Sequence, residues 1–235
     1  MKKIAVIGIS GRMGAELIAL AADFDFEIVQ GVGRTTTMAT SAKTIELKHE
    51  MSQLEPSKFD AVIDFSLPAL TDDVIAWCVA NKKPLVSGVT GISAAQKAKF
   101  TQAASAVPML WAPNMSLGVA VLSRMLAELK NLKGFEFQIE ELHHKQKKDK
   151  PSGTALFLQE KLETAIGKKV PDPLAIRGGG IFGIHRIWAM GEEETLTLEH
   201  NAMNRRVFAR GALKATQWLV TQKPGLYSLN DVLNA

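Results

Sequence analysis

The chain has 235 residues, of which 46% are hydrophobic and 22% are charged, and its formal net charge is +4. This composition is ordinary for a globular protein of one large or two small domains, and no apolar stretch approaches the length of a membrane span. The single cysteine, Cys78, excludes an internal disulfide and cannot by itself build a zinc site, which favours a cytoplasmic setting. The modest basic excess, without a broad basic stripe, argues against nucleic acid as the partner.

Short apolar runs alternate with helical patterns over the first half of the chain. The runs at 3–8, 26–32, 61–65, 84–86 and 107–111 are typical of buried strands, and the segments 11–22, 74–79 and 94–104 have helical spacing. Strands that alternate with helices predict a parallel sheet with helices on both faces. We therefore expect an α/β domain in this part of the chain.

The pattern changes after about residue 114. Helices are expected over 117–129 and 154–166, while the segments 135–140, 185–188 and 195–198 alternate with period two, as strands exposed on one face do. The last two segments are joined by Gly191 and acidic residues and predict an antiparallel hairpin. A final helix near 207–220 is expected to lead the chain back. We therefore expect a smaller α+β domain over 115–211, with 1–114 and 212–235 forming the first domain.

A glycine-rich turn lies between the first predicted strand and the first predicted helix, with the sequence Gly8-Ile9-Ser10-Gly11-Arg12-Met13-Gly14. Gly8 permits a tight turn, Gly11 lets the backbone approach a pyrophosphate, and Gly14 allows close packing of helix against strand. The helix N-terminus offers N–H groups and a partial positive charge to the anion. This placement favours a Rossmann-like dinucleotide-binding domain over a glycine turn without a ligand.

The coenzyme is selected at the end of the second predicted strand. The segment from Gln30 to Thr37 contains no carboxylate that would favour NAD. Arg34 and the hydroxyls of Thr35, Thr36 and Thr37 can instead bind a 2′-phosphate. We therefore predict NADPH over NADH; the alternative is that Arg34 is a solvated loop charge.

The segment 140–155 combines three features that suit the reduction of a small anion. His143 and His144 end a predicted strand, and either can donate a proton near neutral pH. Four lysines crowd the following loop and can bind an anion or stabilise negative charge. The run Ser152-Gly153-Thr154 opens a predicted helix and makes a carboxylate site. Polar loop histidines, a solvated lysine face and a simple N-cap are the alternatives, so the residues alone predict only an anion-binding loop.

Three segments together resemble the dihydrodipicolinate reductase (4-hydroxy-tetrahydrodipicolinate reductase) family. They are the G-x-x-G-R-M-G turn at 8–14, the signature E-x-H-H-x-x-K-x-D-x-P-S-G-T-A at 141–155, and a closing pattern from His185 through 200–212. Family-like motifs at 64–66, 88–91 and 112–116 lie between them in the expected order. The resemblance extends nearly from end to end, and its histidine–lysine signature is highly specific.

The resemblance implies a homotetrameric enzyme of lysine and diaminopimelate biosynthesis that reduces a cyclic imine dicarboxylate with a nicotinamide coenzyme and without a metal. It implies that His143 donates the proton and that Lys147 binds the substrate and assists this step. His144, Ser152, Gly153 and Thr154 are implied in substrate binding. With Gly11 of the turn, the expected coenzyme-binding residues are Gly8, Arg12, Met13, Arg34, Phe65, Gly88, Thr90, Ala112, Asn114 and Met115.

Three alternatives remain open. The first is another Rossmann oxidoreductase, such as an amino-acid dehydrogenase, against which the histidine–lysine signature argues. The second is a module that binds anions or nucleic acid through the loop 145–150, which lacks interleaved aromatic residues for base stacking. The third is a nucleotide sensor with an inactive second domain, against which intact His143, Lys147 and Thr154 argue. The run Gly178-Gly179-Gly180 is either a hinge or a plain loop.

Overall fold

The computed structural model describes residues 1–34 and 45–235, which form two compact units. Unit 1 comprises Met1–Met115 and Phe208–Ala235, and unit 2 comprises Ser116–Val207. Within the described ranges, none of the helices has the length and apolar character that crossing a membrane requires.

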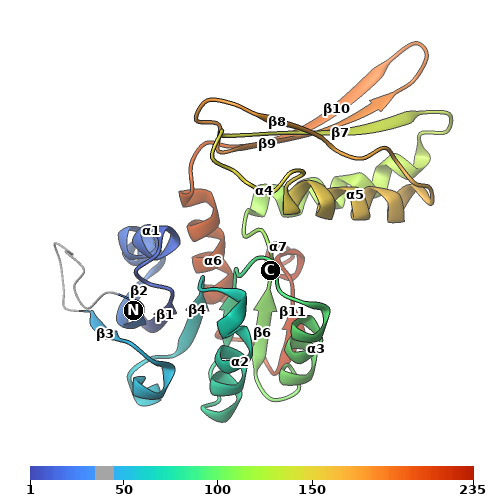
Figure 1. Ribbon diagram of the computed structural model, residues 1–235. Helices are drawn as coiled ribbons and strands as arrows, with labels where there is room; N and C mark the ends of the chain where they lie inside the picture. Colours follow the sequence, from blue (N-terminus) through green and yellow to red (C-terminus); the bar gives the residue numbers. More distant parts are fainter. Residues whose placement is uncertain (35–44) are drawn as a thin grey trace. The chain divides into compact units, whose positions relative to one another are not determined.

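Unit 1 is built on a parallel sheet whose strand order in the described residues is β11-β6-β5-β4-β1-β2-β3 (Figure 1). The strands are β1 (Lys2–Ile7), β2 (Phe26–Val32), β3 (Glu46–Lys48), β4 (Ala61–Asp64), β5 (Leu85–Ser87), β6 (Pro108–Trp111) and β11 (Gly225–Tyr227). The helices are α1 (Arg12–Leu20), α2 (Thr71–Ala80), α3 (Ala94–Ala103), α6 (Arg206–Leu219), which is in unit 1 from Phe208 onward, and α7 (Leu229–Leu233). Short 3₁₀ helices span Ala21–Phe24, Met51–Gln53, Pro56–Lys58 and Pro68–Leu70. The predicted α/β fold is confirmed.

Both faces of this sheet are covered. On one face Ile7 and Val62 belong to the same apolar cluster as Val74 of α2 and Phe100 of α3. Val6 precedes Ile7 on β1, so its side chain points to the opposite face, and it is also fully buried. Strands that are apolar on both faces are typical of parallel sheets flanked by helices on each side, as predicted.

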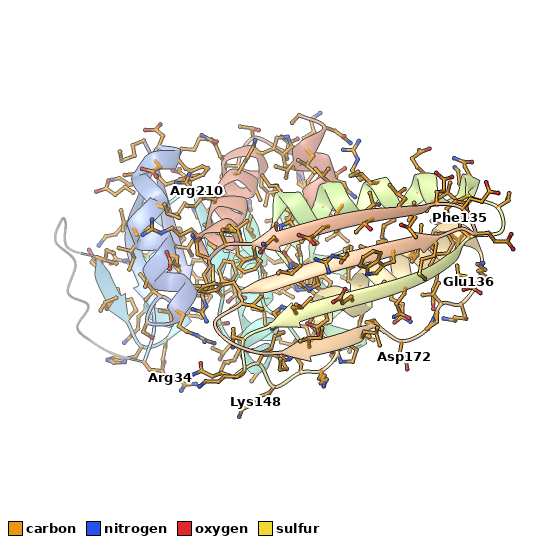
Figure 2. All side chains as sticks on the ribbon, turned by 90° about the horizontal axis from the view of Figure 1, so that it is seen from above. Arg34, Phe135, Glu136, Lys148, Asp172 and Arg210 are labelled. Carbon is orange, nitrogen blue, oxygen red and sulfur yellow. The ribbon has the colours of Figure 1, made fainter. Side chains whose placement is uncertain are left out.

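Unit 2 contains a four-stranded sheet with the order β10-β9-β7-β8. Its strands are β7 (Glu136–His143), β8 (Leu174–Arg177), β9 (Gly183–Met190) and β10 (Thr195–Ala202). β9 runs antiparallel to both β7 and β10, which confirms the predicted hairpin, whereas β8 is parallel to β7. The helices α4 (Leu117–Met125), continued by a 3₁₀ helix over Leu126–Asn131, and α5 (Gly153–Ile166) cover one face (Figure 1), and Figure 2 looks onto the other.

The inward face of β7 changes in character along the strand. Phe137 and Ile139 lie in its first half and pack with apolar residues of α4 and α5. Glu141 and His143 follow on the same face because side chains alternate along a strand. The packed half of the strand thus anchors two polar side chains at its end.

The sequence pattern does not predict β3, β8 or β11. Each has only three or four residues, too few to show an alternating pattern, and each is defined by its pairing with a longer neighbour. The Gly178-Gly179-Gly180 run connects β8 to β9, the two strands on either side of β7, and its role as a hinge stays a prediction.

Candidate active site

The glycine turn of unit 1 joins β1 to α1. Gly8 has a φ of +80°, which favours glycine, and a Cβ there would lie 2.6 Å from the Phe65 carbonyl oxygen. A Cβ at Gly14 would lie 2.0 Å from the Ile9 carbonyl oxygen, so the predicted close packing of this glycine is confirmed. The N–H groups of Gly8 and Ile9 donate to the Val32 carbonyl at 2.9 and 3.1 Å, which attaches the turn to the end of β2.

The N-terminus of α1 suits an anion. Gly11 is its N-cap, no side chain caps the helix, and the first turn carries no acidic residue. Gly11 and Arg12 are exposed, and Met13 is half-buried. A helix N-terminus of this kind fits a pyrophosphate group, so the residues present fit the dinucleotide that the Rossmann-like fold implies.

Arg34 lies beside the glycine turn. Its backbone N–H donates to Ser10 Oγ at 3.1 Å, and a Cβ at Gly33 would lie 2.7 Å from the same oxygen. The Arg34 side chain is exposed (Figure 2). The residue predicted to bind a 2′-phosphate is therefore close to the predicted pyrophosphate site, whereas Thr35, Thr36 and Thr37 lie outside the described residues.

Three more predicted coenzyme residues lie at the carboxyl edge of the sheet, where ligands of open α/β sheets bind. Phe65, Gly88 and Ala112 directly follow β4, β5 and β6, and each donates its backbone N–H to the last residue of the neighbouring strand over 2.9 to 3.1 Å. The Phe65 ring covers Gly88, where a Cβ would lie 2.2 Å from the ring. These residues therefore form a continuous edge with the glycine turn.

The remaining coenzyme candidates differ in accessibility. Thr90 is exposed and Asn114 is half-buried, whereas Met115 is only 1% exposed. A Cβ at Gly211 would lie 1.7 Å from the Met115 carbonyl oxygen, so this methionine is closely packed within unit 1. A coenzyme contact from Met115 stays a prediction.

In unit 2, the candidate proton donor ends β7. His143 is 6% exposed, and its Nδ1 is hydrogen-bonded to Oε2 of Glu141, two residues earlier on the same face. Its Nε2 faces Gly183 of β9, where a Cβ would lie 2.9 Å from this nitrogen. His144 is half-buried, and its backbone N–H donates to the Ile181 carbonyl at 2.6 Å.

Glu141 is fully buried and ion-paired. The Arg177 guanidinium donates to both of its oxygens, at 2.7 and 2.9 Å, and the Ser152 backbone N–H donates at 3.1 Å. Burial opposes ionisation of Glu141, but the hydrogen bonds from Arg177 and His143 outweigh it and hold the pKa of this carboxyl below its usual value. Burial lowers the pKa of His143, and the positive charges of Lys147 and Arg177 act in the same direction, against the attraction of Glu141.

Lys147 follows in the loop after β7. Its Nζ pairs with Asp149 Oδ1 at 2.9 Å, and the other Asp149 oxygen accepts the Gly153 N–H at 3.4 Å. Lys147 and the N-terminus of α5 therefore both contact the Asp149 carboxylate. The other three lysines of the loop are exposed, and Figure 2 shows Lys148 at the surface.

Ser152 is the N-cap of α5 and lies in the interior. Its Oγ accepts the Ala155 N–H at 3.2 Å and is 3.2 Å from His185 Nε2, and the residue is 1% exposed. Gly153 is exposed and Thr154 is half-buried. Ser152 thus links the helix to the sheet, and its contact with substrate stays a prediction.

Sequence reasoning assigns no role to Arg177 or His185. His185 is 3% exposed, its ring lies edge-on to His143 at 5.2 Å between centroids, and burial lowers its pKa to about 3. His200 is its cross-strand partner and is hydrogen-bonded to Ser116 Oγ at 3.0 Å. The alternation of 185–188 could have placed His185 inside, together with Ile187. Arg177 gave no signal because the pairing of β8 is not visible in the sequence.

The polar groups that converge in unit 2 suit proton transfer to a bound anion. A buried imidazole lies near a lysine and a helix N-terminus, which are groups that donate a proton and bind carboxylates. In residues 1–34 and 45–235, no three His, Cys, Asp or Glu side chains are grouped as metal ligands would be.

Comparison with known proteins identifies both halves of the chain. The family model "Dihydrodipicolinate reductase, N-terminus" matches residues 2–115, and "Dihydrodipicolinate reductase, C-terminus" matches residues 118–233. The 4-hydroxy-tetrahydrodipicolinate reductase of Bdellovibrio bacteriovorus is 44% identical over 98% of this chain and 96% of its own length. That of Xanthomonas campestris is 40% identical over 98% and 97%.

Solved structures agree in fold. A dipicolinate-bound dihydrodipicolinate reductase from Paenisporosarcina sp. TG-14 has a TM-score of 0.82 at 20% identity and covers 97% of each chain. An amine dehydrogenase from Mycobacterium smegmatis has a TM-score of 0.70 at 10% identity, covering 97% of this chain and 95% of its own, so the fold is shared with other oxidoreductases. The matches over both halves, and the relatives aligned over nearly their whole length, show that this chain belongs to the 4-hydroxy-tetrahydrodipicolinate reductase (dihydrodipicolinate reductase) family, oxidoreductases of lysine and diaminopimelate biosynthesis.

Proposed function

We propose that this protein catalyses the NAD(P)H-dependent reduction of 4-hydroxy-tetrahydrodipicolinate, via dihydrodipicolinate, to tetrahydrodipicolinate. The observation that carries the proposal is the buried His143, oriented by Glu141, in the same unit as Lys147 and the N-terminus of α5. Family membership supports the reaction type and the pathway. In this proposal unit 1 is the dinucleotide-binding domain and unit 2 is the substrate-binding and tetramerisation domain.

The protein's own groups act on a dicarboxylate. Lys147, Gly153 and Thr154 bind carboxylate oxygens, which is supported by the Asp149 carboxylate that Lys147 and the Gly153 N–H already share. His144 and Ser152 complete the substrate site. His143 donates a proton to the ring as it is reduced, and Lys147 stabilises the negative charge on the anionic side. When bound, the nicotinamide coenzyme supplies the hydride from its C4 position.

We propose NADPH as the preferred coenzyme, with NADH as a possible substitute. The fit of the glycine turn and the α1 N-terminus to a pyrophosphate supports a dinucleotide, and exposed Arg34 beside Ser10 supports binding of a 2′-phosphate. The pyrophosphate and ribose are held by Gly8, Gly11, Arg12 and Met13. The nicotinamide side is contacted by Phe65, Gly88, Thr90, Ala112, Asn114 and Met115.

We also propose a homotetramer assembled through the unit 2 sheet. Leu174, Ile176 and Leu196 expose 58, 46 and 43% of their surface, and the first two point to the side of β8 away from Arg177. Light scattering after chromatography should show a tetramer that Ile176→Asp dissociates, whereas Leu226→Asp, at a similarly exposed position in unit 1, leaves it intact. A monomeric wild type would contradict this assembly.

The reaction is tested by coenzyme oxidation with substrate formed in situ from pyruvate and aspartate semialdehyde by a purified synthase. We expect the wild type to oxidise NADPH and His143→Ala to lose roughly 10²-fold or more in kcat, the contribution of general acid catalysis, while its Kd for NADPH is unchanged. His49→Ala, at an exposed histidine, is the matched control and should retain full activity. A wild type that binds a coenzyme but is inactive with both NADPH and NADH would overturn the proposed reaction.

A further inference from the structure

We propose that Glu141, held by Arg177, is a positioning residue that fixes the tautomer of His143, so that Nε2 is the nitrogen that transfers the proton. The catalytic meaning of this inference rests on the proposed function. The tautomer itself is a property of the free protein and is measurable without any reaction.

The two oxygens of Glu141 have a defined set of partners. Oε1 accepts from the Arg177 terminal nitrogen at 2.7 Å and from the Ser152 backbone N–H at 3.1 Å. Oε2 accepts from the other Arg177 terminal nitrogen at 2.9 Å and is hydrogen-bonded to His143 Nδ1. The carboxyl group is fully buried, so these hydrogen bonds are shielded from solvent.

The partners decide where the proton of neutral His143 lies. An arginine and a backbone N–H can only donate, and the positive charge of the bidentate arginine favours the ionised form, so Glu141 is a carboxylate that accepts at both oxygens. Its low pKa agrees with this state. The hydrogen bond between Glu141 and His143 must then have Nδ1 as the donor. Neutral His143 therefore carries its proton on Nδ1, and Nε2 is the basic nitrogen.

Nε2 of His143 is then the nitrogen that can transfer a proton to the substrate. Nε2 faces Gly183, and a Cβ at this position would lie only 2.9 Å away, so the glycine preserves space at this nitrogen. The next proton that His143 binds goes to Nε2, and the same N–H bond breaks when the proton is transferred. Histidine returns to the Nδ1–H tautomer, still bound to Glu141, as in catalytic triads in which a carboxylate orients the imidazole.

Arg177 has two functions in this arrangement. Its side chain is 14% exposed and forms a bidentate pair with Glu141, which restricts the rotation of the carboxylate. It also donates to the Asp149 carbonyl at 2.6 Å, which ties the Glu141–His143 pair to the loop that carries Lys147. The arginine thus holds the acceptor for His143 and the substrate-binding loop in one network.

A glutamine at position 141 would reverse the tautomer. With its NH₂ group at the Oε1 position, it would oppose two donors, Arg177 and Ser152. With the NH₂ group at the Oε2 position it would oppose one arginine N–H and would donate to His143 Nδ1. The second orientation leaves fewer donors unpaired, and it requires Nδ1 to be an acceptor, which moves the histidine proton to Nε2.

The experiment is long-range ¹H–¹⁵N NMR of the full chain labelled with ¹⁵N-histidine, at a pH where His143 is neutral, with its signal assigned by loss in His143→Ala. We expect Nδ1–H in the wild type and Nε2–H in Glu141→Gln, together with a fall in kcat of about 10²-fold or more and little change in the Kd for NADPH. Arg177→Lys should keep the Nδ1–H tautomer, because Glu141 stays ionised, and should lose less activity than Glu141→Gln.

Glu163→Gln is the matched control. Glu163 also pairs with a basic side chain, Lys169, and accepts a backbone N–H, that of Val170, but it contacts no histidine. It should leave the His143 tautomer and kcat unchanged. An Nε2–H tautomer in the wild type overturns the inference, even if Glu141→Gln does not fold, and so does an unchanged tautomer in folded Glu141→Gln. Absence of reductase activity in the wild type would instead refute the proposed reaction and leave the tautomer result standing.

Discussion

Gly14 of α1 lies directly against the backbone of Ile9, so closely that a Cβ would come within 2.0 Å of the Ile9 carbonyl oxygen. We predict that Gly14→Ala lowers the free energy of unfolding by about 2 kcal/mol or more, because overpacking outweighs the gain of roughly 1 kcal/mol in helix propensity. Urea unfolding followed by circular dichroism measures the change, and coenzyme affinity should fall with it. Gly180→Ala is the control, since nothing lies within 4 Å of a Cβ there. Equal stability of Gly14→Ala and wild type would contradict the prediction.

Arg34 is predicted to discriminate between the two coenzymes. Replacing it with alanine removes charged hydrogen bonds to a 2′-phosphate, which should raise KM for NADPH roughly tenfold or more and leave KM for NADH nearly unchanged. Initial rates with each coenzyme measure the ratio. Arg12→Ala, at the first residue of α1, should weaken the binding of NADPH and of NADH to the same extent. Equal KM values for NADPH in Arg34→Ala and wild type would remove Arg34 from the coenzyme site.

Lys147 is predicted to differ from the other lysines of its loop. It is partly buried and paired with Asp149, whereas Lys148 is exposed. We expect Lys147→Ala to reduce kcat/KM for the dicarboxylate by about 10²-fold, since a charge-assisted contact worth up to about 3 kcal/mol is lost. Lys148→Ala should stay within about twofold of wild type. Similar losses in both variants would indicate a general effect of positive charge rather than a specific contact.

His185 is predicted to make the protein sensitive to acid. Its folded-state pKa of about 3 lies below the value of about 6.5 in the unfolded chain, so the unfolded state binds the proton first. The contribution of neutral His185 to the free energy of unfolding is complete above pH 6.5 and is lost as the pH falls from 6.5 toward 3. At pH 5 the loss is about 2 kcal/mol. We expect His185→Gln to reduce the difference in unfolding free energy between pH 8 and pH 5 by about this amount.

The control for this measurement is His49→Gln, which makes the same substitution at an exposed position. The lowered pKa values of His143 and His200 act in the same direction, so the pH dependence of His185→Gln should be reduced rather than abolished. A pH dependence identical to that of the wild type would show that His185 is not buried in its neutral form.

Motifs whose conformation depends on residues adjacent in the chain could be predicted from the sequence. Gly8 and Gly14 have their roles because of the strand before them and the helix after them, and the structure has both elements at these positions. The same holds for the β9–β10 hairpin, whose alternation and turn residues are adjacent in the chain. The close approach of the Met115 carbonyl to Gly211 could not be predicted in this way, because the two residues are distant in the sequence, and a coenzyme contact from Met115 stays a prediction.

The fold class, the glycine turn and the family are all readable in the sequence, because they depend on hydrophobic periodicity, glycine spacing and a long signature within one stretch of chain. The surroundings of His143 are not, because they depend on strand pairing. Arg177 reaches Glu141 because the short strand β8 pairs with β7, and His185 reaches the same face because β9 pairs with β7 from the other side. Strand pairing is a long-range interaction between backbone groups that are alike in every residue, so the partners of a buried side chain are chosen by how the whole sheet packs.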